Sequence, residues 1–171
     1  WLGLGRLGSV SRSATYFPKW TATLKTSMAE ETRLLLEDFT FRDGTAFLDL
    51  LTAKYSFVNS ELAAHYGLPA PSGTGFSKVN FSATDPRAGV LTHASLLTAY
   101  SQSETLSPIL RGKFIRDVFT CEHPPPPPPG VAPINEATPT SVREKLEQHR
   151  TNPACAGCHA PGAGFGDTQS I

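Results

Sequence analysis

Residues 22–39 read ATLKTSMAEETRLLLEDF, and this stretch sets the fold class of the chain. Its large apolar side chains include Leu24, Met28, Leu35 and Phe39, which recur at helical spacing with charged residues between them. Such a stripe is typical of an amphipathic helix that packs one face against a core. We therefore predict a helix over about 22–39 at the centre of a mostly α-helical protein.

Capping and turn residues predict further short elements on both sides of an irregular middle region. Before the middle region we predict a helix capped by Thr45 that carries Phe47, Leu50 and Leu51 toward the core, and a short helix opened by Val58–Ser60 and closed by Gly67. The middle region contains one extended stretch near 76–82 but no whole sheet, and helical spacing resumes over 90–100. Further on we predict a helix begun by Ser107–Pro108 that carries Leu110, Phe114 and Val118, and a helix that starts with the Ser141–Glu144 capping box.

The composition narrows the classes of partner. Lys and Arg number 15 and Asp and Glu number 15, so nothing in the net charge favours nucleic acid or an anionic membrane surface. No apolar run approaches the ~20 residues that a membrane-spanning helix needs. No secretory leader precedes Trp1, yet the motif described below is of a kind that is completed outside the bacterial cytoplasm. We therefore expect the chain to be an internal piece or a processed form of a longer exported protein.

Six consecutive prolines, Pro124–Pro129, divide the sequence. Such a run forms a stiff polyproline helix, so a spacer is favoured over a ligand for a proline-recognising partner. The predicted organisation is a helical scaffold module at 1–121, a Pro-rich connector at 122–139 and a small module at 140–171.

The last module contains the one stretch of the sequence that indicates a specific chemistry, Asn152-Pro153-Ala154-Cys155-Ala156-Gly157-Cys158-His159. Cys-x-x-Cys-His is the attachment motif of c-type haem. If Asn152 caps a helix and Pro153 takes its first position, Cys155, Cys158 and His159 share one helix face. Two thioethers then anchor the porphyrin edge while the His159 imidazole reaches the iron. The sequence therefore predicts a covalent haem c.

Several segments, in the same order, resemble the planctomycete-type cytochrome c-like proteins of unknown function, a large bacterial group. They are Glu37–Asp38 through Asp49–Asn59, Leu62–Pro69, Gly89–Ser95, Thr105–Lys113, the polyproline run, Leu146–Arg150, Asn152–Cys155 and Cys158–His159. One departure concerns Ala160–Phe165, which is shorter than the corresponding family stretch and lacks its Met.

The resemblance implies an origin in a long, exported, multi-module bacterial protein, of which this chain would be two adjoining modules. It implies haem at Cys155, Cys158 and His159, a periplasmic or extracellular location, and other modules of the same protein or redox proteins as partners. It implies little about physiology, because the group is poorly characterised.

The second axial ligand of the iron stays open. No His or Met follows His159, and the only methionine, Met28, belongs to the predicted core stripe. Met ligation raises the potential of cytochromes c, so its absence favours a lower-potential bis-His iron or an open site. The other histidines are His65, His93, His123 and His149, of which His93 fits a core residue best; water, a substrate or an external residue are equal alternatives.

Electron transfer is therefore the favoured function, and two alternatives remain. A haem with an open sixth position would be an enzyme of peroxidase or oxygenase type. Alternatively, Cys121 and His123 with Cys155 and Cys158 would form a Cys3His site for structural zinc.

For the remaining cysteine and charged residues, the sequence favours structural or solvated roles over functional ones. If Cys155 and Cys158 hold haem, Cys121 is left over; it could pair with a segment outside this chain, but a buried small side chain is favoured. The pairs Glu30–Glu31 and Glu37–Asp38 are expected on the solvated side of their helix. Arg111 and Lys113 could bind an anion or haem propionates, although a solvated face is favoured.

Overall fold

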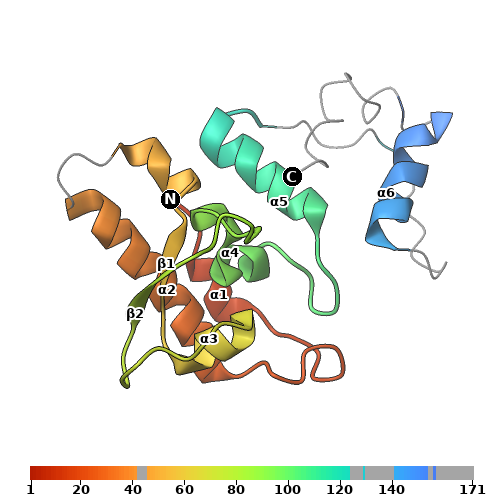
Figure 1. Cartoon of the computed structure of the whole chain (residues 1–171). Coiled ribbons are helices and arrows are strands. Elements are labelled where there is room, and N and C mark those ends of the chain that lie inside the picture. The colour runs from red at the N-terminus through yellow and green to blue at the C-terminus, as the bar shows by residue number, and fades with distance from the viewer. Residues whose placement is uncertain (42–45, 124–128, 130–140, 154–155, 157–171) are drawn as a thin grey trace. The chain divides into compact units, whose positions relative to one another are not determined.

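The computed structural model describes residues 1–41, 46–123, 129, 141–153 and 156. The chain forms two compact units, Leu2–Thr105 and Leu106–Ile171, and Trp1 belongs to the second. The first unit contains α1 (Gly5–Ser9), α2 (Ala22–Phe41), the 3-10 helix η1 (Phe47–Leu51), β1 (Tyr55–Val58), α3 (Ser60–Tyr66), β2 (Ser77–Asn80), the 3-10 helix η2 (Val90–Thr92) and α4 (Ala94–Ala99); the second contains α5 (Pro108–Ile115), the π-helix η3 (Arg116–Thr120) and α6 (Val142–Thr151) (Figure 1). The mostly helical class is confirmed.

Helix α2 is the centre of the first unit, as predicted. Thr21 caps it, because its Oγ1 accepts the N–H of Leu24 at 2.9 Å. The four apolar residues of the stripe are all buried. Leu24 and Met28 join a core with Leu7, Val58, Leu62, Ala63 and Ala94. This core gathers α1, α3, α4 and β1 around one helix.

A two-stranded antiparallel sheet lies against α2 (Figure 1), with Tyr55 opposite Asn80 and Val58 opposite Ser77. The strand β2 falls within the predicted extended stretch, whereas β1 was not predicted. In β1 the buried positions are Ser56 and Val58. A serine at a buried position removes the apolar alternation by which such a strand is recognised.

Helix α3 follows the predicted capping chemistry. The Asn59 side chain accepts the N–H of Leu62 at 2.9 Å, and Gly67 ends the helix with a φ of 70°. Glycine adopts this left-handed conformation without a Cβ penalty, which is why helices so often end on it.

Two predicted helices are shorter than expected. The segment after Thr45 forms only a 3-10 helix that buries Leu50, while Phe47 is 62% exposed; Thr45 itself lies outside the described residues. The helical spacing over 90–100 is broken at His93, whose ψ of 138° separates η2 from α4. There the backbone turns so that the His93 ring enters the core.

The backbone at Gly89 lies against the backbone of Leu50 and Leu51. Its φ is 61°, its N–H donates to the Ala53 carbonyl at 2.8 Å, and an added Cβ would lie 2.2 Å from the Leu51 carbonyl carbon. Only a residue without a Cβ fits here.

In the second unit, Ser107 caps α5 by accepting the N–H of Leu110 at 3.3 Å, as predicted. Phe114 is buried and meets the Phe119 ring edge-on at 5.8 Å. The capping box at the start of α6 is also confirmed, since Ser141 Oγ accepts the Glu144 N–H at 3.2 Å and donates to its carboxylate at 3.0 Å.

The prediction that Cys121 is buried is wrong. Cys121 is exposed and has a φ of 56°, because it ends η3 at the point where the chain turns out of the helix. Residues 124–128 and 130–140 lie outside the described part, so the predicted connector over 122–139 stays a prediction.

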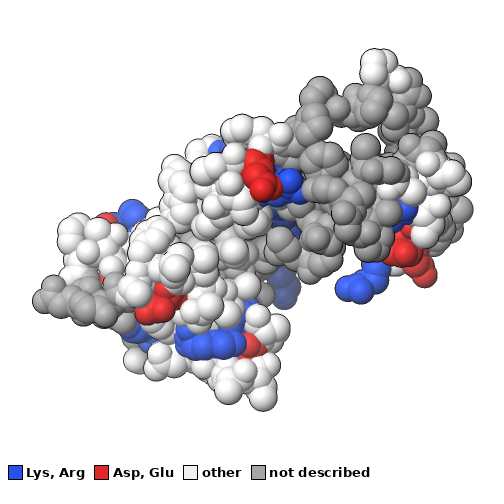
Figure 2. Space-filling model, turned by 90° about the horizontal axis from the view of Figure 1, so that it is seen from above, with Lys and Arg blue, Asp and Glu red and all other residues white. Residues whose placement is uncertain are grey.

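Among the described residues no helix is both long and apolar enough to cross a membrane. On the face shown in Figure 2, acidic and basic side chains are interspersed, in keeping with a net charge of +0.

Candidate functional site

The predicted haem-attachment residues Cys155, Cys158 and His159 lie outside the described residues, but the chain that leads into them is described. Helix α6 ends at Thr151, and the N–H of Ala156 donates to the Asn152 carbonyl at 2.8 Å. Residues 154–155 and 157–171 lie outside the described residues, so the predicted helix that starts at Asn152 and carries the motif stays a prediction.

Arg150 lies in the last turn of α6, immediately before this predicted helix start. Its side chain is 23% exposed, and its Nη1 lies 3.4 Å from Oε2 of Glu147. Its Nε is buried without a hydrogen-bond partner. The Nε of Arg111 in α5 is likewise buried without a hydrogen-bond partner, so this feature is not specific to the residues beside the motif.

The candidate second ligands have different surroundings. His93 is 2% exposed, with Nδ1 2.9 Å from Thr32 Oγ1 and Nε2 3.3 Å from Ser56 Oγ, so both ring nitrogens are engaged and it is the satisfied core histidine that the sequence favours. His65 is exposed at the end of α3, and the exposed His123 lies 3.1 Å from Asp117. The side chain of His149 lies outside the described residues.

His93 belongs to a buried polar cluster centred on Glu31 of α2. Glu31 is 0% exposed and accepts hydrogen bonds from Ser56 of β1 at 2.7 Å and from the Tyr66 hydroxyl of α3 at 2.6 Å. The Tyr66 oxygen in turn accepts the N–H of Ala94 at 2.9 Å. The cluster therefore ties together α2, β1, α3 and the start of α4.

The hydrogen-bond directions in the cluster follow from one another. Because Ser56 gives its proton to Glu31, its oxygen accepts from His93 Nε2. The neutral His93 ring then accepts at Nδ1 from Thr32, whose oxygen lies 2.6 Å from Ser95 Oγ. With Glu31 ionised, each of these polar groups has a partner.

Burial shifts the pKa values of both titratable groups toward their neutral forms. It raises the pKa of Glu31 to about 7, against the opposing effect of the hydrogen bonds from Ser56 and Tyr66. It lowers the pKa of His93 to about 3. Because the cluster is enclosed, we assign it a structural role: its hydrogen bonds hold the elements of the first unit together.

The prediction that Glu31 is solvated is therefore wrong. Sequence reasoning treated it together with Glu30 as one charged pair. Glu31 is three residues after Met28 and four before Leu35, which places it on the buried stripe of α2. That spacing was the signal that could have identified it.

We predict that the two groups give the first unit a flat stability maximum between pH 4.5 and 6.5. Below pH 4.5 the unfolded state binds the His93 proton that the folded state refuses down to about pH 3, so stability falls with acidification. Between pH 6.5 and 7 the folded state retains the Glu31 proton that the unfolded state has lost, so stability falls as the pH rises.

Urea unfolding at a series of pH values measures this profile, with Glu31→Gln as the comparison. In that variant only the His93 effect remains, so stability is expected to rise with pH from 3 to 6.5 by up to about 1.4 kcal/mol per pH unit. Identical profiles for the two proteins would contradict the assignment to Glu31.

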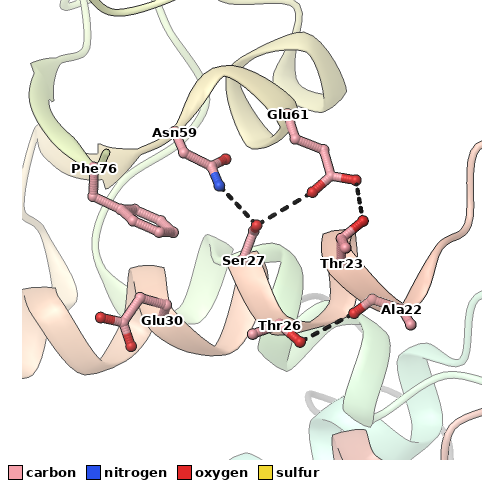
Figure 3. Close-up of a pocket in the computed structure, with 8 residues that line it drawn as sticks. All are labelled: Ala22, Thr23, Thr26, Ser27, Glu30, Asn59, Glu61 and Phe76. Carbon is pink, nitrogen blue, oxygen red and sulfur yellow. Dashed lines mark hydrogen bonds between the residues drawn. The ribbon is translucent and has the colours of Figure 1, made fainter. Parts of the chain in front are cut away.

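A surface hollow lies beside the N-terminal half of α2 (Figure 3). It has a volume of ≈ 510 Å³ and is lined by Ala22, Thr23, Thr26, Ser27, Glu30, Asn59, Glu61 and Phe76. The Glu61 carboxylate accepts from Thr23 at 2.8 Å and from Ser27 at 3.3 Å, and Asn59 donates to Ser27 at 2.8 Å. These bonds join α3 to α2, so the polar groups of the hollow already serve the fold.

Comparison with family models covers most of the chain. Residues 1–68 match PSD4, described as a protein of unknown function (DUF1592), and residues 87–166 match PSCyt3, also described as a protein of unknown function (DUF1588). Both are families of planctomycete cytochrome c-like proteins. The resemblance seen in the sequence is thereby confirmed at the level of the families. No curated protein and no solved structure matched the chain.

The border between the two planctomycete cytochrome c-like matches does not coincide with a border in the structure. Glu31, Ser56 and Tyr66 belong to the PSD4 match, whereas His93 and Ser95 belong to the PSCyt3 match. All five meet in the buried cluster of the first unit. The first unit therefore needs residues from both matches.

Proposed function

We propose that the chain carries a c-type cytochrome module, which binds one covalent haem and transfers electrons within an exported multi-module bacterial protein. The observation that carries this proposal is the Cys-x-x-Cys-His motif formed by Cys155, Cys158 and His159 in the sequence. The match to two planctomycete cytochrome c-like families supports it.

In this proposal Cys155 and Cys158 form the thioether attachments and His159 binds the iron from one side. A bound haem supplies one-electron redox chemistry, and the chain supplies attachment, orientation and burial. The two hydrogen bonds of His93 remove it from the candidates for a second ligand. Partners would be other modules of the same protein or redox proteins in the periplasm or outside the cell.

The test is expression in a host with periplasmic haem-attachment machinery, followed by a pyridine haemochrome spectrum. We expect covalent haem in the native protein, close to complete loss in the Cys155→Ala/Cys158→Ala variant, and full retention in Cys121→Ala. Cys121 is the matched control because it is exposed and outside the motif.

Each other outcome has a meaning. A colourless native protein with stoichiometric zinc would overturn the haem proposal in favour of a structural module. Covalent haem with low-spin iron supports the electron carrier. High-spin iron with covalent haem would instead favour a haem enzyme with an open coordination position.

A further inference from the structure

A second surface hollow in the first unit lies beside α1 and the residues that follow α4. Its volume is ≈ 510 Å³, and it is lined by Arg6, Ser9, Val10, Ser11, Ala99, Ser101 and Ser103. The lining therefore carries one guanidinium and several hydroxyls, and none of these residues is acidic. Hydrogen-bond donors next to a positive charge are the groups that bind an anion.

Three of these donors are not used by the fold. The side chains of Arg6, Ser11 and Ser103 make no hydrogen bond or ion pair with the rest of the described chain. The guanidinium carbon of Arg6 lies 5.1 Å from the centroid of the Tyr100 ring, a contact that gives its N–H groups no oxygen acceptor. Other described arginines do pair with carboxylates, namely Arg33, Arg87, Arg116 and Arg150.

Hydrogen bonds hold the two chain segments of the hollow together. The N–H of Ser13 donates to the Ser103 carbonyl at 3.1 Å. The Arg12 guanidinium donates to the Thr98 carbonyl at 3.2 Å and also to the Gln102 carbonyl. Because Arg12 pairs with no carboxylate among the described residues, it places a second positive charge next to the hollow. An anion bound there would be attracted by both arginines.

We infer that this hollow binds a tetrahedral oxyanion, a phosphate or sulfate group, through the Arg6 guanidinium and the hydroxyls of Ser11 and Ser103. Donors on three separate segments suit an anion whose oxygens point in several directions, whereas a carboxylate presents two oxygens in one plane. The oxyanion comes either from a free inorganic ion or from an ester of a small molecule. The inference concerns the first unit and does not depend on haem.

The test is a titration of the full chain with inorganic phosphate, inorganic sulfate, glycerol phosphate and acetate at constant ionic strength. The shifts of the amide resonances of residues 9–11 and 101–103, measured by NMR, give the affinities. We expect Arg6→Gln to weaken phosphate binding by about tenfold or more, and Ser11→Ala/Ser103→Ala by about fivefold, because charge-assisted hydrogen bonds are lost. Arg33→Gln is the matched control and should bind as the native protein does, since Arg33 is an exposed arginine already paired with Glu30 and Glu37.

The outcomes separate a site from general attraction of anions. Equal phosphate affinity in the native protein and Arg6→Gln, or an equal loss in Arg33→Gln, would overturn the inference, and so would acetate binding as tight as phosphate binding. If Arg6→Gln does not fold, the double serine variant decides, because neither hydroxyl bonds to the rest of the described chain. Tighter binding of glycerol phosphate than of inorganic phosphate supports the inference with an ester as ligand, and equal binding supports it with the free ion.

Discussion

Replacement of Gly89 by alanine is expected to lower the stability of the first unit by about 4 kcal/mol, which corresponds to a fall in Tm of roughly 15–30 °C. Two effects add. The φ of 61° with a ψ of −178° is a backbone region that side chains with a Cβ rarely occupy. In addition, the new Cβ would lie 2.3 Å from the Leu51 carbonyl oxygen and 2.5 Å from that of Leu50, and neither backbone group can move aside as a side chain would.

The matched control for this variant is Gly8→Ala. Gly8 lies within α1 and nothing lies within 4 Å of the position of its added Cβ. Alanine there should be neutral or stabilise by up to about 1 kcal/mol, since it reduces the freedom of the unfolded chain. Thermal unfolding followed by circular dichroism separates the two, and equal Tm values for Gly89→Ala and Gly8→Ala would show that the close approach at Leu51 is absent in solution.

Truncation of the buried carboxylate by Glu31→Ala should cost about 3 kcal/mol, because it leaves the hydroxyls of Ser56 and Tyr66 buried without their acceptor. The link between β1, α3 and α2 is lost with it. The free energy of unfolding in urea measures the effect, with Trp1 replaced by Phe so that Trp20, which packs against the core of the first unit, is the only tryptophan.

Glu30→Ala is the control, and it removes the neighbouring carboxylate on the same helix. The Glu30 side chain is 35% exposed and its main partner is Arg33, which is 49% exposed. Ion pairs at the surface contribute little, so a change within about 0.5 kcal/mol is expected. If both variants lost the same small amount, the buried cluster would not be stabilising the fold.

Local features of this chain could be predicted from its sequence because their causes are local. The stripe of α2, the Asn59 cap and Gly67 end of α3, the Ser107 cap of α5 and the Ser141–Glu144 capping box each depend on residues within one or two turns. The Cys-x-x-Cys-His motif can likewise be recognised from the sequence because its residues are adjacent in the chain.

Features that depend on distant partners could not be predicted in the same way. The strand β1 could not be recognised from its sequence because a serine, Ser56, occupies a buried position in it. The Ser56 hydroxyl is buried there only because Glu31 and His93 lie opposite it. Cys121 was expected inside, but the end of η3 turns it outward.

The sequence by itself determined the helical class and several helix ends, since periodicity and capping act over a few residues, and it contains the Cys-x-x-Cys-His pattern. Only the tertiary structure decided that Glu31 and His93 are buried partners, that Gly89 must approach the backbone at Leu51, and that segments from two family matches form one unit. The physical reason is that a polar or glycine residue acquires these roles from the groups placed against it, and those groups lie tens of residues away in the chain.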